Sequence, residues 1–203
     1  MFKFFGLAVA ALHLVAPPAT PQPVLEAGVY ELDRTRSSLR WKVTNPSLSN
    51  YTARFTNFDA ILDIDPAKLG AAALAVTIDP KSLRTDFPFA ETFDRELIQD
   101  STFFNSVKFP KIDFTSTKIE QTSETSFEVV GILTLIGVPR PLIIDVTIAE
   151  LREQQGNGSL ALAFSATSTL KRSEFGIITR IFISDDVLLR IEGVLLRRSP
   201  PTR

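Results

Sequence analysis

The sequence predicts an all-β protein in which strands cover one another's apolar faces by closing into a barrel or a sandwich. Apolar and polar residues alternate in short runs along nearly the whole chain, most clearly at residues 127–135 and 142–148, which the tight sequence 135–141 joins. This is the period of a strand with one face in water. Because no helical domain is predicted to cover the apolar faces, they must pack against each other. The interior of such a closed sheet is apolar.

Turn residues between the alternating runs mark where one strand ends and the next begins. Asp65-Pro66 and Asp79-Pro80 end two of the alternating runs, and a Gly-Asn-Gly sequence at 156–158 ends another. The pattern predicts eight or nine antiparallel strands. Strands are expected at residues 28–33, 37–44, 58–65, 74–78, 112–119, 127–135, 142–151, 160–166 and 187–191.

Residues 82–106 interrupt the strand pattern with a helical segment. Phe89, Phe93 and Leu97 are spaced four apart, and charged residues lie between them. This spacing predicts a short amphipathic helix after Pro88. The helix and its neighbouring phenylalanines either form a lid over an open end of the barrel or fill that end as ordinary core.

The N-terminus is typical of an export signal. Lys3 precedes an apolar stretch at residues 4–15, which is shorter than the roughly 20 apolar residues that a membrane span needs. We expect a signal peptide at 1–19, a linker at 20–27, one barrel domain at 28–196 and a disordered tail at 197–203. Cleavage near Ala16 or Ala19 is predicted, with retention as a loose anchor as the alternative. The protein is therefore expected to be periplasmic or secreted.

Composition disfavours several classes of function. The chain has 22 basic and 23 acidic residues without long blocks of either sign, so a nucleic-acid surface is not expected. It has no Cys, and its one histidine, His13, lies in the predicted signal peptide. A mature domain without His or Cys lacks the usual parts of zinc and copper sites and of His-dependent triads. We expect no metal, no cofactor and no catalysis.

Phenylalanine dominates the aromatic residues, with 16 Phe against 2 Tyr and 1 Trp. Rings without a polar group belong in an interior, either as core or as the wall of a ligand cavity. Eleven apolar residues are predicted to face a cavity. They are Phe55, Phe58, Leu62, Val76, Ile78, Phe93, Phe114, Leu133, Leu135, Ile144 and Phe164.

A set of short motifs occurs in a characteristic order. The motifs are FTNFD at 55–59, SLRT at 82–85, DREL at 94–97, FFN at 103–105, FPKIDFTST at 109–117, GILTLIGVPRP at 131–141, KRSEFGI at 171–177 and SDDV at 184–187. Together they resemble the YceI family of exported lipid-binding proteins over residues 30–192. The resemblance implies an eight-stranded, lipocalin-like antiparallel barrel that holds a polyisoprenoid or an isoprenoid quinone in a long apolar tunnel without performing chemistry on it.

The chain departs from the family pattern at three positions. Family members usually carry histidines where this chain has Arg36 or a neighbour and Glu96, and a glycine where it has Ala53. If those histidines contact a ligand head group, this protein is expected to bind a different head group or none. A polar head could also meet basic residues in the connections, namely Arg84, Arg95, Arg140, Lys171 and Arg172.

Two other functions compete with lipid binding. One is a structural or adaptor barrel with a filled core that binds a protein through an exposed edge or patch. The other is an enzyme that uses Glu96 with Asp94, although residues at i and i+2 of a helix point to different sides. Asp59, Asp63 and Asp65 alternate along a strand and lack the spacing of a calcium loop. Pairing of two barrels into a homodimer is left open.

Overall fold

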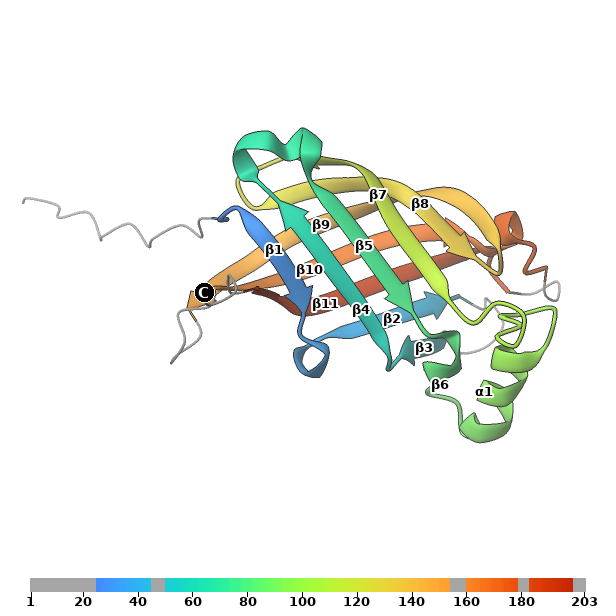
Figure 1. The fold of residues 1–203 in the computed structure, drawn as a ribbon. Helices are drawn as coiled ribbons and strands as arrows, with labels where there is room; N and C mark the ends of the chain where they lie inside the picture. The colour runs from blue at the N-terminus through green and yellow to red at the C-terminus, as the bar shows by residue number, and fades with distance from the viewer. Residues whose placement is uncertain (1–24, 45–49, 154–159, 179–182, 199–203) are drawn as a thin grey trace, which may run out of the picture.

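The computed structural model describes residues 25–44, 50–153, 160–178 and 183–198 (Figure 1). The predicted signal peptide, most of the linker, the turn at 156–158 and most of the tail lie outside these residues. The strands are β1 (Gly28–Leu32), β2 (Ser38–Val43), β3 (Tyr51–Phe55), β4 (Phe58–Ile64), β5 (Ala73–Ile78), β6 (Leu83–Thr85), β7 (Ile112–Gln121), β8 (Ser126–Leu135), β9 (Val138–Glu153), β10 (Leu160–Lys171) and β11 (Asp186–Arg197).

Eight of these strands form a closed antiparallel barrel. The order is β1-β4-β5-β7-β8-β9-β10-β11, and β11 pairs back onto β1 with Tyr30 opposite Arg197. Inward and outward residues alternate along each strand, so the barrel interior collects the apolar set that the sequence pattern identifies. The eight-stranded barrel expected from the YceI resemblance is confirmed.

Strands β2, β3 and β6 extend the sheet at one end of the barrel. Strand β11 pairs with β1 at Leu195–Arg197 and with β2 further towards its start, where Ile191 lies opposite Leu39. Strand β3 pairs with β2, and the three residues of β6 pair with β3. The alternation of apolar and polar residues does not predict β3 and β6. Both are short, and β3 buries only Ala53 and Phe55.

The hairpin between β8 and β9 is tighter than the sequence suggests. Ile136 and Gly137 both have positive φ angles, 46° and 76°, which defines a two-residue turn of the kind that matches strand twist. Strand β9 therefore begins at Val138 and includes Pro139 and Pro141. The described pairing of β9 with β10 starts only at Asp145, so these prolines lie where their missing N–H groups interrupt no pairing with β10.

A short helix, α1 (Ala90–Gln99), closes the end of the barrel where β4 and β7 begin (Figure 1). The predicted helix is confirmed. Asp94 is buried and accepts hydrogen bonds from the Thr85 backbone N–H (2.9 Å) and Oγ1 (2.6 Å), which ties α1 to β6. Leu97 is buried, and the Phe93 ring lies 5.1 Å from that of Phe87. Leu97 belongs to the buried core cluster, and Phe103 and Phe104 after the helix pack against it, so the helical segment covers this end as core.

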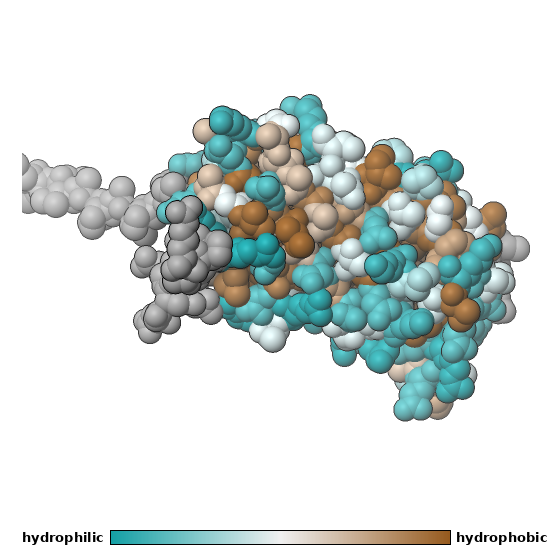
Figure 2. All heavy atoms as spheres, in the orientation of Figure 1, coloured by the Kyte–Doolittle hydropathy of each residue, from teal (hydrophilic) through white to brown (hydrophobic). Residues whose placement is uncertain are grey.

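The outer surface is mixed in character. Brown apolar residues appear among teal polar ones over the front strands in Figure 2. Along β4, for example, the exposed side chain of Ile61 lies between those of Asp59 and Asp63. Asp59 forms an ion pair with Arg34 at 2.6 Å. Within the described ranges, no helix has the length and apolar character needed to cross a membrane.

Candidate functional site: an apolar cavity in one half of the barrel

The barrel interior is hollow in one half. A cavity of about 110 Å³ occupies this half, and all 20 residues that line it are apolar. They come from β1, β2, β4, β5, β7, β8, β9, β10 and β11 and from Leu25, just before β1. We call this region the hollow half. Such a surface offers no hydrogen bond to a ligand, so it can bind only an apolar group.

The alternation along the strands builds the cavity wall. On β4, Phe58, Ala60, Leu62 and Ile64 all point inward and all line the cavity. Ala60 and Ala166 are the smallest of the lining residues, and they leave space that a larger side chain would fill.

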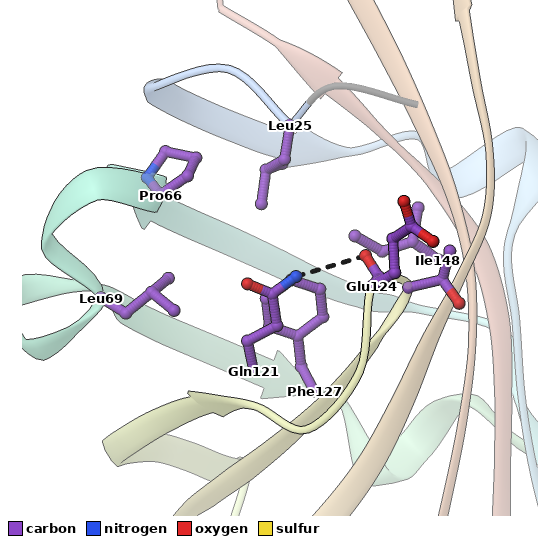
Figure 3. Close-up of a pocket in the computed structure, with 8 residues that line it drawn as sticks. Leu25, Pro66, Leu69, Gln121, Glu124, Phe127 and Ile148 are labelled. Atoms are coloured by element: carbon purple, nitrogen blue, oxygen red, sulfur yellow. Dashed lines mark hydrogen bonds between the residues drawn. The ribbon is translucent and has the colours of Figure 1, made fainter. Parts of the chain in front are cut away.

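The mouth of the barrel lies at the end opposite α1. A second pocket of about 140 Å³ adjoins the cavity there and shares Leu25, Phe127 and Ile148 with it. Figure 3 shows Leu25 and Leu69 directed towards the ring of Phe127. We call this second pocket the mouth pocket. Its other lining residues are Pro66 and Leu69 of a short 3₁₀ helix and Gln121, Glu124 and Thr125 around the β7–β8 turn.

The mouth pocket therefore combines an apolar wall with a polar rim. Gln121 Nε2 donates a hydrogen bond to the Glu124 carbonyl oxygen at 3.2 Å (Figure 3). This bond holds the turn beside the cavity opening. An amphipathic ligand with its tail in the hollow half would place its head among these polar groups.

Leu25 is held at the mouth by its neighbours. Tyr30 Oη donates to the Glu26 carbonyl oxygen at 2.9 Å, and Arg197 pairs with the Glu26 carboxylate at 2.5 Å. Arg197 also donates to the Ala27 carbonyl oxygen at 2.6 Å. Tyr30 is fully buried, and this burial raises the pKa of its hydroxyl above the ordinary value, so the group stays protonated and able to donate at neutral pH.

The other half of the barrel, towards α1, is filled by its own side chains. We call it the packed half and define it by Phe55, Ile78, Leu83, Leu97, Ile112, Phe114, Leu133 and Leu135, all of which are buried core residues. The rings of Phe55 and Phe104 meet edge to face with centroids 5.6 Å apart. The residues contributed by the helical segment thus close this end.

Phe114 lies where the two halves meet. It pairs across the sheet with Val76, which lines the cavity, and with Leu133, which belongs to the packed half. A Cβ atom added to Gly131 would lie 2.4 Å from Phe114 Cζ. The Phe114 ring therefore fills the space that a side chain at position 131 would occupy, and it forms the floor below the cavity.

The predicted cavity residues divide between the two halves. Phe58, Leu62, Val76, Ile144 and Phe164 line the cavity. Phe55, Ile78, Phe114, Leu133 and Leu135 instead belong to the packed half, and Phe93, on α1, is half-buried against that core. The lining also includes residues that were not predicted from the sequence, namely Leu25, Leu32, Leu39, Ala60, Ile64, Leu74, Ile119, Phe127, Val129, Val146, Ile148, Leu162, Ala166, Ile191 and Leu195.

The basic residues considered for a head group line neither the cavity nor the mouth pocket. Arg140 donates to the Glu174 carbonyl oxygen, and Lys171 pairs with Asp186 at 2.9 Å. Arg172 donates to backbone carbonyl oxygens, among them those of Ile177, Ile183 and Ser184. These side chains hold the connections together. The polar rim beside the cavity is supplied instead by the β7–β8 turn.

The carboxylates also have structural roles. Asp94 is buried against Thr85, whereas Glu96, two residues later on α1, is exposed, so the two do not form a pair. Asp65 caps the 3₁₀ helix that follows it. In the part of the chain that the structure describes, no three His, Cys, Asp or Glu side chains gather in a way that could hold a metal ion.

The fold and the site define a class: a small antiparallel barrel with an apolar internal cavity that opens at one end. Residues 30–195 match the model of the YceI-like domain, and the chain belongs to the YceI-like family.

Known proteins similar to this chain support that assignment. A UPF0312 protein of Shewanella baltica is 33% identical over 179 residues, which cover 87% of this chain and 88% of that protein. The crystal structure of a Campylobacter jejuni YceI protein is 30% identical with a TM-score of 0.66, covering 78% of this chain and 91% of that one. A polyisoprenoid binding domain from Saccharophagus degradans shares the fold at 15% identity, with a TM-score of 0.59 and coverage of 84% and 98%.

Proposed function

We propose that this protein is an exported, non-catalytic binding protein that holds an isoprenoid-type lipid, either a polyisoprenoid or an isoprenoid quinone. The observation that carries the proposal is the wholly apolar lining of the cavity in the hollow half. The name of the Saccharophagus degradans neighbour, a polyisoprenoid binding domain on the same fold, supports the choice of lipid. The signal-like N-terminus supports export to the periplasm or the outside.

Burial of the tail provides the binding free energy. Each methylene-sized group that moves from water into a dry pocket contributes about 0.8 kcal/mol. A few prenyl units are therefore enough to offset association costs of roughly 4 to 15 kcal/mol. Shape and tail length, rather than hydrogen bonds, set the selectivity, and the head group stays at the mouth pocket.

The bound lipid can be identified directly. The protein is purified from its exported fraction without detergent, extracted with organic solvent and analysed by mass spectrometry. The proposal predicts an isoprenoid lipid in stoichiometric amount. An empty extract from well-folded protein, together with failure to take up added isoprenoids, would contradict the proposal and favour an adaptor barrel.

A matched pair of double variants tests whether the cavity is the binding site. Leu62→Asp with Ile144→Asp places two carboxylates in the cavity, and lipid is expected to be lost because a buried charge cannot be solvated there. Ile61→Asp with Ile143→Asp changes exposed neighbours on the outer face of the same strands and is expected to keep the lipid. Circular dichroism checks that both variants retain the β signature.

A further inference from the structure

We propose that the outer face formed by β2, β3, β6 and the start of β11 is a docking surface for an anionic lipid membrane. Arginines lie directly opposite one another across these four strands. We call them the arginine row; its members are Arg190, Arg40, Arg54 and Arg84. The proposal concerns the outside of the protein and does not depend on which ligand occupies the cavity.

The register of the four strands builds the arginine row. Arg190 of β11 pairs with Arg40 of β2. Arg40 pairs in turn with Arg54 of β3, and Arg54 pairs with Arg84 of β6. All four residues are exposed and alternate with inward-facing neighbours. Because neighbouring strands lie about 4.8 Å apart, the row is about 14 Å long. Its members are distant in sequence, so no block of positive charge marks the surface there.

The arginine row is unfavourable for the folded protein taken alone. Like charges directly opposite each other across a sheet destabilise it. Acidic residues offset this repulsion at two positions: Glu192 pairs with Arg190 at 2.7 Å, and Asp86 pairs with Arg54 at 3.3 Å. The repulsion is therefore only partly compensated within the protein, and an anionic partner would compensate the rest.

The other two arginines have no acidic partner in the described part of the chain. Arg84 donates instead to the backbone carbonyl oxygens of Lys81 and Leu83. Lys42, two residues after Arg40 on the same face of β2, is also exposed. This face thus carries five basic and two acidic side chains, a net charge of +3, whereas the whole chain carries a net charge of -1.

The chemistry of this face indicates the partner. Arginine guanidinium groups match the geometry of phosphate and bind it with paired hydrogen bonds. Leu188, which is 49% exposed, lies opposite Lys42 within the same face. Apolar side chains among basic ones are typical of surfaces that bind where lipid head groups meet acyl chains. The arginine row therefore fits the phosphate groups of acidic phospholipids.

Cosedimentation with vesicles tests the proposal. Exported protein, purified without detergent, is mixed with vesicles of phosphatidylcholine alone or of phosphatidylcholine and phosphatidylglycerol in equal amounts, and the pelleted protein is quantified. We expect the anionic vesicles to bind about a hundredfold more tightly, because each positive charge near an anionic surface strengthens binding about fivefold. High ionic strength should remove this preference, since it screens exposed charges.

A matched pair of double variants tests the role of the arginine row. Arg40→Gln with Arg84→Gln removes the two charges that lack acidic partners and is expected to weaken binding to the anionic vesicles about 25-fold. Its thermal stability should not fall, because the substitutions relieve repulsion. Lys111→Gln with Lys118→Gln changes the net charge equally at exposed positions just before and on β7, which lies opposite β11 in the closed barrel order. This control is expected to bind as the natural protein does.

Three outcomes would overturn the proposal. Equal loss of binding in the two double variants would show that net charge, and not the arginine row, is responsible. Equal binding to vesicles with and without phosphatidylglycerol would show that the contact does not depend on anionic lipid. Folded protein that binds neither kind of vesicle but binds dextran sulfate would have a soluble polyanion as its partner.

Discussion

Strands β5, β7 and β8 contribute inward residues with the same alternation to both halves of this barrel, yet one half is hollow and the other is filled. Inward positions in the hollow half include Ala60 and Ala166, which are too small to reach the barrel axis. Inward positions in the packed half carry rings such as Phe55 and Phe114, and the segment around α1 adds Phe104. Side-chain size at a few inward positions, together with the cover that β3, β6 and α1 give to one end, therefore decides which half of this barrel is hollow.

The largest difference should appear when a leucine is removed from each half. Leu133→Ala, in the packed half, is expected to lower the free energy of unfolding by about 4 kcal/mol, since it leaves a new cavity among fixed neighbours. Leu62→Ala, in the hollow half, is expected to cost about 2.5 kcal/mol, because its side chain already borders empty space and has fewer contacts to lose. Urea unfolding monitored by circular dichroism measures both. Equal losses would remove the energetic distinction between the halves.

The strand pattern in the sequence predicts much of this architecture. Alternation identifies the barrel strands and which of their residues face inward, and the spacing of Phe89, Phe93 and Leu97 identifies α1. Strand β6 could not be predicted in this way, because three residues are too few to show an alternation. The pattern therefore predicts the barrel and which alternate residues of each strand face its interior.

The boundary between the halves could not be predicted in the same way. Whether an inward residue lines a cavity depends on its partners across the sheet, such as the Phe114 ring that lies over Gly131. The role of Leu25 depends on contacts from Tyr30 and from Arg197, which is 172 positions further along the chain. The sequence pattern shows which side of a strand faces in, whereas these three-dimensional contacts decide what the side chain meets there.

The close contact at the floor gives a second prediction. Gly131→Ala would place a Cβ 2.4 Å from both Phe114 Cζ and the Thr115 carbonyl oxygen, and it is expected to destabilise the protein by about 2 kcal/mol through overpacking. Adding Phe114→Leu should recover part of that loss, because it relieves the ring contact but not the backbone contact. A double-mutant cycle from chemical denaturation measures the coupling. Strict additivity would mean that the ring does not fill this space.

Weakening the contacts that hold Leu25 at the mouth should lower the free energy of unfolding by a smaller amount. Tyr30→Phe removes the hydrogen bond to the Glu26 carbonyl oxygen and is expected to cost about 1 kcal/mol. Amide hydrogen exchange should rise around residues 25–28 and stay unchanged around β8. Unchanged exchange at the mouth would show that Arg197 alone holds Leu25.

The smallest effect is expected at the connection before β11, far from the cavity. Hydrogen bonds, first that of the Ser173 hydroxyl, hold the pKa of Asp185 below its ordinary value. A lowered pKa in the folded state contributes stability above the unfolded value of about 3.9, and this contribution is lost as pH falls through the folded value. Ser173→Ala should therefore be less stable than the natural protein at pH 7, with the difference shrinking below pH 4. A difference that is constant from pH 7 to pH 3 would contradict this account.

The most direct test of the division between the halves is methyl NMR during titration with a three-unit prenol. Spectra are recorded on protein labelled at Ile, Leu and Val methyl groups. The account predicts large chemical-shift changes at Leu62, Val146 and Leu162, which line the cavity, and small ones at Leu83, Leu97 and Leu135 in the packed half. Changes of similar size in both halves, or changes confined to the packed half, would contradict it.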